Sequence, residues 1–306
     1  MTDENRNDGR VLGYSALATA GSLWGTGFVF GKWALEQLTV GQMVFLRFLF
    51  ASLGLLPVIW YESRHSSIRI RRGDLALIVV AAALGVPIQF IIQFEGLART
   101  TVSHASLMVG ILPVLLAAGA AVFSRERLDA IGWLGLLASV VGAGLVAAGA
   151  AGGGGSGAQG PTLSGDLFVV ASLVAAVAWI LMSQALMRRG YSPVMTSAVV
   201  IITGTILLAG WVAATDGMPA FGRLSLATWG SVAAMGILAT ATTTLLWNWG
   251  LQQVPASQAG VFVNLEPVVG AILGVALFHE AMGVLAILGG LLILAAAVVV
   301  SRRSSA

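Results

Sequence analysis

The sequence predicts an all-α polytopic membrane protein, with ten transmembrane helices arranged as two inverted five-helix repeats. Composition is the first observation behind this prediction, because 58% of the 306 residues are hydrophobic and only 9% are charged. Soluble domains carry roughly 25% charged residues. The formal net charge of +3 comes from residues in short connections, so the sequence shows no basic face for nucleic acid.

Segment length is the second observation. A transmembrane helix takes about 20 apolar residues, and ten segments meet this requirement: residues 12–32, 41–60, 74–95, 101–123, 128–149, 166–187, 194–214, 226–249, 256–278 and 282–301. The first segment lacks a clear small-residue cleavage site. We therefore interpret it as a retained span and not as a removed signal.

The third observation is an internal repeat with a constant offset of 154 positions. Seven residues recur unchanged at this offset, in the pairs Gly96/Gly250, Leu97/Leu251, Ser103/Ser257, Ala105/Ala259, Pro113/Pro267, Glu126/Glu280 and Gly135/Gly289. This regularity indicates duplication of one unit. The expected parts are a tail at 1–11, a first repeat at 12–150, a glycine-rich linker at 151–165, a second repeat at 166–301 and a tail at 302–306.

Basic residues predict the orientation. With a cytoplasmic N-terminus, only Lys32, Arg99 and Arg223 fall on the far side of the membrane. The cytoplasmic side then holds Arg6, Arg10, Arg64, Arg69, Arg71, Arg72, Arg125, Arg127, Arg188, Arg189, Arg302 and Arg303. This bias follows the positive-inside rule, so we expect both tails in the cytoplasm and the linker outside it. Because each repeat has five spans, the second repeat must be inverted, an arrangement that in many carriers encloses a central site.

Two tryptophans, Trp24 and Trp179, are expected near mid-bilayer. Each lies about twelve residues into its helix, at a rise of about 1.5 Å per residue. Other tryptophans, Trp247 among them, fit the aromatic belts at the membrane surfaces. The two central indoles could line a substrate cavity with Phe28 and Met108, or they could pack helices together, and the sequence leaves both interpretations open.

Polar side chains at membrane depth are further candidates, since each needs a partner there. Gln89 and Gln93 lie four residues apart on one helix face and could together hold one end of a zwitterion. Asn264 is a third candidate for substrate binding. The alternative is hydrogen bonding between helices, worth under about 2 kcal/mol per bond, and we favour it for Thr242–Thr244.

Arg47 and Glu266 are the deeply placed charges. We expect them to pair, directly or through water, in one of two access states, as a gate or a structural latch. Pro113 and Pro267 are expected in mid-helix, where a proline permits a kink, and are candidates for bending elements. Pro87 predicts a bend without a counterpart, because the equivalent position in the second repeat holds alanine.

The remaining polar residues suit structural roles. Glu126 and Glu280 are expected to cap or pair at helix ends, Glu95 and Arg99 to form a surface ion pair, and His104 to be a satisfied polar group. With three histidines and no cysteine, we expect no metal site and no cofactor. An enzyme is disfavoured, because no nucleophile and base lie at a common depth.

Several motifs carry a resemblance to a known family. They are the Trp24–Gly25 step in the first span, Arg47 within LRFLFAS, and the paired Pro-x12-Glu patterns that end at Glu126 and Glu280. With these features the chain resembles the drug/metabolite transporter superfamily over its whole length, and in particular its ten-span EamA-type branch. It is most similar there to the YddG-type bacterial exporters of aromatic and other amino acids.

The resemblance implies a carrier of the bacterial inner membrane that exports small, mainly apolar metabolites by alternating access. We expect a monomer, since each half can bury its polar groups against the other. Its partners would be an amino acid or similar small molecule and the lipid bilayer. A nucleotide-sugar or phosphorylated-metabolite antiporter is the alternative, although Arg47 and Lys32 are few cations for a phosphate group. A single deep acid, Glu266, favours facilitated diffusion over a proton relay, and proton antiport stays open.

Overall fold

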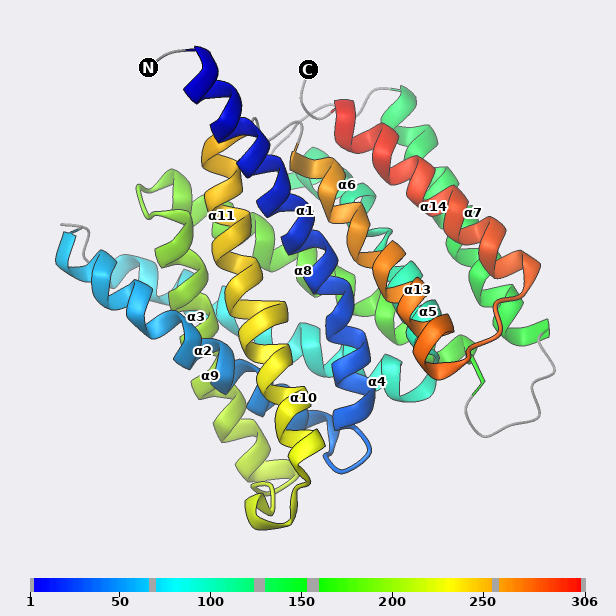
Figure 1. The fold of residues 1–306 in the computed structure, drawn as a ribbon, viewed down its shortest axis with the longest axis horizontal. Helices are drawn as coiled ribbons and strands as arrows, with labels where there is room; N and C mark the ends of the chain where they lie inside the picture. The colour runs from blue at the N-terminus through cyan, green and yellow to red at the C-terminus, as the bar shows by residue number, and fades with distance from the viewer. Residues whose placement is uncertain (1–2, 66–69, 124–129, 153–159, 255–258, 304–306) are drawn as a thin grey trace.

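The computed structural model describes residues 3–65, 70–123, 130–152, 160–254 and 259–303. Within these ranges the chain forms a bundle of helices without β-strands (Figure 1). The helices of the first half are α1 (Asp3–Ala34), α2 (Val40–His65), α3 (Leu75–Ala83), α4 (Gln89–Arg99), α5 (Val102–Val109), α6 (Leu112–Phe123) and α7 (Ala130–Gly152). Those of the second half are α8 (Leu163–Arg188), α9 (Pro193–Thr215), α10 (Leu226–Gly236), α11 (Thr243–Gln253), α13 (Leu265–Phe278) and α14 (Val284–Arg303).

The ten predicted spans are present in this order, some of them built from two helices. A π-helical segment, η2 (Leu84–Ile88), joins α3 to α4, and another, η4 (Ile237–Thr242), joins α10 to α11. Eight helical segments of the described chain are long and apolar enough to cross a membrane, and α14 has a shorter apolar stretch, Val284–Val299. α1 is not one of those eight, but it packs along α11 and α13 as part of the bundle. The all-α polytopic fold is therefore confirmed.

Equivalent helices of the two halves run in opposite directions. At the start of α2, the Thr39 hydroxyl donates a hydrogen bond of 2.5 Å to the Asp216 carboxylate at the end of α9. At the start of α9, the Ser192 hydroxyl donates a hydrogen bond of 2.8 Å to the Glu62 carboxylate at the end of α2. Glu62 and Asp216 are 154 positions apart, and Thr39 and Ser192 are 153 apart. The repeats are therefore inverted at these helices, as the sequence predicts.

The two ends of the bundle can be told apart by the chain termini. α1 begins and α14 ends on the same side, at the top of Figure 1. We call this side the terminus end, and we call the opposite side, which holds the turn between α4 and α5, the far end. At the far end, the Gln37 side-chain oxygen accepts hydrogen bonds of 2.9 Å from the Ser225 backbone N–H and from the Thr228 hydroxyl.

The same contact recurs at the terminus end, with each residue shifted by 154 positions. Here the Tyr191 hydroxyl accepts a hydrogen bond of 3.0 Å from the Arg71 backbone N–H and donates one of 2.7 Å to the Asp74 carboxylate. We call these contacts, together with the two between α2 and α9, the end ties. They form two matching sets, so both ends of this part of the bundle are held in the same way.

The two π-helical segments also occupy equivalent positions in the repeats. The prediction that the Pro87 bend has no counterpart is therefore wrong. In η4, which contains no proline, the Thr240 hydroxyl donates a hydrogen bond of 2.9 Å to the carbonyl of Met235, five residues earlier. The π turn of the second repeat is thus accompanied by the Thr240 hydrogen bond. That of the first repeat is accompanied by Pro87, which has no backbone N–H to donate.

Pro113 and Pro267 lie just after a break in their spans and not in mid-helix. A turn at residues 110–111 separates α5 from α6, so Pro113 is the second residue of α6. The 3-10 segment η5 (Gly260–Asn264) precedes α13, whose third residue is Pro267. Proline is tolerated in a first turn, because the N–H it lacks would have no intrahelical partner there. In both repeats the α-helix of this span is therefore interrupted just before the proline.

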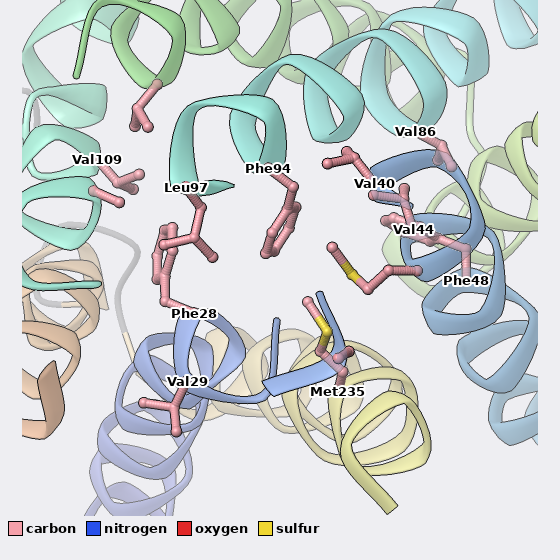
Figure 2. Close-up of a cluster of buried hydrophobic side chains, with 14 of the residues drawn as sticks. Phe28, Val29, Val40, Val44, Phe48, Val86, Phe94, Leu97, Val109 and Met235 are labelled. Atoms are coloured by element: carbon pink, nitrogen blue, oxygen red, sulfur yellow. The ribbon is translucent and has the colours of Figure 1, made fainter. Parts of the chain in front are cut away.

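The apolar core is continuous in the middle and at the far end. Its main cluster joins residues of both repeats, such as Phe28, Phe94 and Met235 (Figure 2). Toward the terminus end, smaller clusters are separate from it, one around Leu17 on α1 and α11 and another around Ile78 on α3, α8 and α9. Apolar contact between the α1–α11 group and the group of α3, α8 and α9 is thus more extensive at the far end than at the terminus end.

Candidate functional site

Arg47 lies about two turns into α2, close to three aromatic rings. Its guanidinium carbon is 4.5 Å from the ring centroid of Phe90, 5.3 Å from that of Phe48 and 5.6 Å from that of Phe94. Aromatic faces attract a cation at these distances. Nε donates a hydrogen bond of 3.0 Å to the Thr240 hydroxyl. The side chain is 6% exposed, and no other hydrogen bond joins it to a described residue.

Glu266 and Asn264 lie where α13 begins. No hydrogen bond or ion pair within 4.0 Å joins the Glu266 carboxylate to another described residue. The expected Arg47–Glu266 ion pair is thus not formed in this conformation, although the two charges interact through space. Asn264 donates a hydrogen bond of 3.2 Å to the Val261 carbonyl, and its Oδ1 is buried without a partner in the described chain.

The central tryptophans contact different partners. The Trp24 ring lies 5.1 Å from that of Trp247, at an angle of 49°. The Trp179 indole N–H donates a hydrogen bond of 2.5 Å to the Gln89 side chain. No ring contact joins Trp24 to Trp179 among the described residues. The assignment of Trp247 to an interfacial belt is wrong, because its half-buried ring packs on the central Trp24.

The other predicted binding residues are covered in this conformation. Phe28 and Met108 are 3% and 1% exposed, and Phe28 lies 6.2 Å from Phe94 between ring centroids (Figure 2). Gln93 is 5% exposed and makes no hydrogen bond with a described residue, whereas Gln89 is engaged by Trp179. The two glutamines therefore do not act as a matched pair here. A substrate could reach these side chains only after the helices around them move.

We predicted that Thr242–Thr244 form hydrogen bonds between helices. Two of these three residues do not. The hydroxyls of Thr243 and Thr244 donate to the carbonyl of Thr240 in the same span, over 2.8 and 2.7 Å. That prediction is wrong for Thr243 and Thr244. Their bonds follow η4 directly, so they satisfy the polar groups near the π turn.

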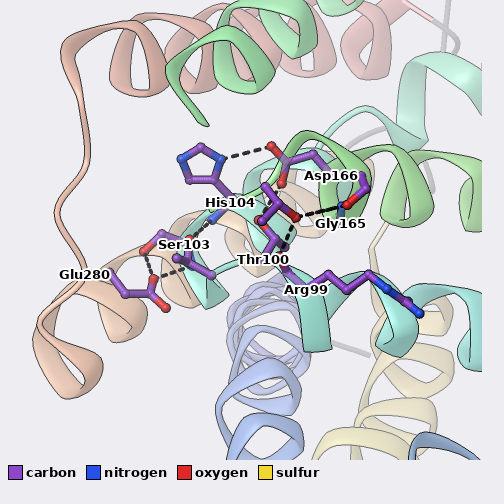
Figure 3. A network of polar contacts seen from close by, with 10 residues as sticks. Arg99, Thr100, Ser103, His104, Gly165, Asp166 and Glu280 are labelled. Carbon is purple, nitrogen blue, oxygen red and sulfur yellow. Dashed lines mark hydrogen bonds and ion pairs between the residues drawn. The ribbon is translucent and has the colours of Figure 1, made fainter. Parts of the chain in front are cut away.

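At the far end, Glu280 caps a helix of the other repeat. Its carboxylate accepts hydrogen bonds from the backbone N–H groups of Val102 and Ser103, over 2.7 and 2.8 Å, and from the Ser103 hydroxyl, over 2.6 Å (Figure 3). A helix N-terminus has unpaired N–H groups and a partial positive charge, so it favours a carboxylate. The expected capping role of Glu280 is confirmed. Its equivalent, Glu126, lies outside the described residues.

A second carboxylate, that of Asp166 on α8, binds the same turn. Its Oδ1 accepts a hydrogen bond of 2.7 Å from the Thr100 hydroxyl, and its Oδ2 lies 3.1 Å from Nδ1 of His104 (Figure 3). Both side chains of the His104–Asp166 contact are at most 3% exposed. His104 is thus a satisfied polar group, as expected. Asp166 was not predicted from the sequence, because an acid in the first turn of a helix looks like an ordinary cap.

Lys32 binds the carbonyl groups of the same turn, at the end of α4. Its ammonium donates hydrogen bonds of 3.2 and 3.0 Å to the carbonyls of Leu97 and Thr100, where α4 ends and a cation is favourable. We call Glu280, Asp166 and Lys32, together with the turn they bind, the far-end clamp. The predicted surface ion pair between Glu95 and Arg99 also forms, with 2.6 Å between Oε2 and Nη1.

Comparison with known proteins assigns the family. The model of the EamA-like transporter family matches residues 11–148 and, a second time, residues 163–302. The chain belongs to the EamA-like transporter family. It is accordingly a multi-pass membrane transporter of the drug/metabolite transporter superfamily, and the two matches agree with the end ties in relating one half to the other.

Relatives of this EamA transporter are similar over most of their length. The uncharacterized transporter YetK of Bacillus subtilis is 24% identical over 92% of this chain and 86% of its own. A probable terminal-alkyne amino-acid exporter of Streptantibioticus cattleyicolor is 24% identical, over 77% and 76%. The biotin transporter of Escherichia coli is 22% identical, over 92% and 90%. A crystal structure with 19% identity matches with a TM-score of 0.63 over 95% of this chain and 97% of the other, which supports the fold.

Proposed function

We propose that this EamA transporter exports small, mainly apolar zwitterions, above all aromatic and other neutral amino acids, by alternating access across a bacterial inner membrane. The observation that carries the proposal is that neither Arg47, which is surrounded by three phenylalanine rings, nor Glu266 has an ion-pair partner among the described residues. A zwitterion offers a carboxylate to the cation and an ammonium to the acid, and an apolar side chain suits the rings. One relative is named a probable amino-acid exporter, which supports the same substrate class.

The proposed roles follow from depth and chemistry. Arg47 and Glu266 act as a gate: they pair with each other when it is closed and interact with the two charges of the zwitterion when it is open. The breaks before Pro113 and Pro267 let their spans bend. Substrate contacts are assigned to one group of mid-depth side chains: Trp24, Phe28, Gln89, Gln93, Met108, Trp179 and Asn264. Trp247 joins this group, because any rearrangement of Trp24 changes the contact between the two rings.

Charge argues against the rival substrates. A nucleotide sugar or a phosphorylated metabolite needs several free cations, and the ammonium of Lys32 is already bound to two carbonyls at the end of α4. Arg47 alone is a weak site for a phosphate group. No reaction is proposed for the protein, since its family is one of transporters.

Transport in proteoliposomes tests the proposal. Purified protein is reconstituted, and uptake of radiolabelled phenylalanine, leucine, biotin and a uridine-diphosphate sugar is followed with and without a pH gradient. We expect saturable uptake of the amino acids, driven by their own gradient. Acceleration by a pH gradient would indicate proton antiport instead. Uptake of biotin or of the nucleotide sugar alone would contradict the proposed substrate class.

Replacement of Arg47 tests the central residue. Arg47→Ala should lower the transport rate by about tenfold or more, because one charge-assisted hydrogen bond contributes about 1.5–3 kcal/mol. Arg47→Lys should retain part of the rate, since it keeps the charge and loses the planar fork. Arg64→Ala is the matched control, because Arg64 also lies over an aromatic ring, that of Trp60, but at the surface. Wild-type transport by a folded Arg47→Ala variant would refute the role.

A further inference from the structure

Among the described residues, the far-end clamp is found at one end of the bundle, whereas the end ties occur in matching sets at both ends. The far-end clamp binds the turn between α4 and α5 with two carboxylates from the second repeat, Asp166 and Glu280. We propose that Glu280 is the latch that keeps the far end closed, and that its carboxylate must leave the N-terminus of α5 before substrate can pass.

The backbone conformation just before Glu280 directs its side chain toward the N-terminus of α5. α13 ends at Phe278, and the backbone of the next residue, His279, is left-handed, with φ 53° and ψ 35°. This conformation reverses the chain after the helix and turns the next side chain back toward α5. There the two carboxylate oxygens take separate N–H groups, those of Val102 and Ser103, and one of them also accepts the Ser103 hydroxyl. A complete cap of this kind is lost in a single step when the carboxylate withdraws.

The electrostatics of the turn favour the closed arrangement. Glu280 lies at the positive N-terminus of α5, and Lys32 lies at the negative C-terminus of α4. The two opposite charges also attract each other through space. Lys32 and the turn that it binds belong to the first repeat, and Glu280 belongs to the second. Separation of the repeats at this end therefore weakens the Glu280 cap and the Lys32–Glu280 attraction at once.

Burial indicates what the latch covers. Every residue from 101 to 110 is buried, so α5 is packed on all sides. Ser106, one turn below the cap and 0% exposed, lies against Gly270 of α13. Movement of Glu280 away from α5 frees the contact between α5 and α13, and Ser106 then becomes accessible. The proposal rests on alternating access, but it does not depend on the substrate.

Thiol labelling tests the latch directly, since the native chain has no cysteine. Ser106→Cys is introduced as a nearly isosteric reporter, and its reaction with a membrane-impermeant maleimide is timed in vesicles of both orientations. Glu280→Gln should raise the labelling rate about tenfold from the far-end side, since it removes a charged acceptor. Glu95→Gln, the same change in an exposed ion pair at the same end, should leave the rate unchanged.

A second reporter separates gating from loss of structure. Thr196→Cys is placed on α9 toward the terminus end, where the Thr196 hydroxyl is buried without a described partner. Opening of the latch leaves its labelling unchanged, whereas unfolding raises it together with that of Ser106→Cys. If Glu280→Gln does not fold, Glu280→Asp decides, because its carboxylate stays charged but reaches less far, and labelling should rise by a smaller factor. An unchanged rate at Ser106→Cys in a folded variant overturns the proposal.

Discussion

The end ties and the far-end clamp hold the same molecule in different ways. Each end tie has a counterpart 153 or 154 residues away, and both members are formed at the same time. Within the described residues the far-end clamp joins the repeats at one end, since the residues equivalent to its Glu280 cap, Glu126 and Ser257, lie outside them. Its Asp166–His104 contact has no sequence counterpart, because the position 154 after His104 is a glutamine. Contacts that exist at both ends at once cannot alternate, whereas a contact confined to one end can.

This difference divides the bundle into a constant part and a changing part. The end ties connect α2 and α9 with the neighbouring starts of α3 and α10, so we expect these helices to keep one arrangement throughout a transport cycle. The far-end clamp connects α5 with α8 and with the end of α13. We therefore expect substitutions in the end ties to lower stability, and substitutions in the clamp to change the balance between access states.

The largest effect is expected for Asp74. Asp74→Ala removes the acceptor of the Tyr191 hydroxyl and of the Arg189 guanidinium and should lower the free energy of unfolding by about 2–3 kcal/mol. Thr228→Ala, its counterpart at the far end, removes one neutral hydrogen bond and should cost about 1 kcal/mol. Thermal unfolding in detergent measures both. Equal losses would show that charge plays no part in the difference between the two ends.

Next in size is a substitution that crowds the clamp. At Gly274 an added Cβ would lie 2.5 Å from Oε2 of Glu280 and 2.8 Å from the Ser103 backbone nitrogen. Gly274→Ala should therefore cost about 1–3 kcal/mol by overpacking, and it should also increase labelling of Ser106→Cys. Gly283→Ala, where an added Cβ meets nothing within 4 Å, is the control. A purely destabilising Gly274→Ala, without greater accessibility, would assign the clamp to the constant part.

Much of this arrangement could be predicted from the sequence. The constant offset identifies which helices are equivalent, and an odd number of spans then requires inversion. Glu280 was predicted as a helix cap because it lies just beyond an apolar helix. Pro113 and Pro267 marked the spans that bend, since proline restricts the preceding turn.

The sequence could not identify which helices touch. The offset relates α1 to α8, but it does not show that Trp24 of α1 packs against Trp247 of α11. Trp247 was therefore assigned to the membrane surface. Asp166 was missed for the same reason, because its partners are 62 and 66 residues away in the other repeat. The π turn of η4 has no proline to mark it, and its only local sign is a run of threonines that also fits an ordinary helix.

A smaller and equal effect is expected at the two ends of α2 and α9. Thr39→Val and Ser192→Ala each remove a helix cap and a hydrogen bond to a carboxylate, and each should cost about 1 kcal/mol. The two sites are at opposite ends of the bundle, so the losses should add in the double variant within about 0.5 kcal/mol. Chemical denaturation of the single and double variants measures this. A strongly non-additive result would mean that the two ends are coupled through α2 and α9.

The smallest effect is expected at His279, which links α13 to the clamp. A non-glycine residue in the left-handed region costs about 1 kcal/mol, and glycine adopts it freely. His279→Gly should therefore stabilise the protein by less than about 1 kcal/mol, because the more flexible unfolded chain offsets part of the gain. Since Glu280 keeps its direction, labelling of Ser106→Cys should stay at the wild-type rate. His279→Val, which disfavours the left-handed region, should raise that rate by misdirecting Glu280, and no increase would show that the turn does not position the latch.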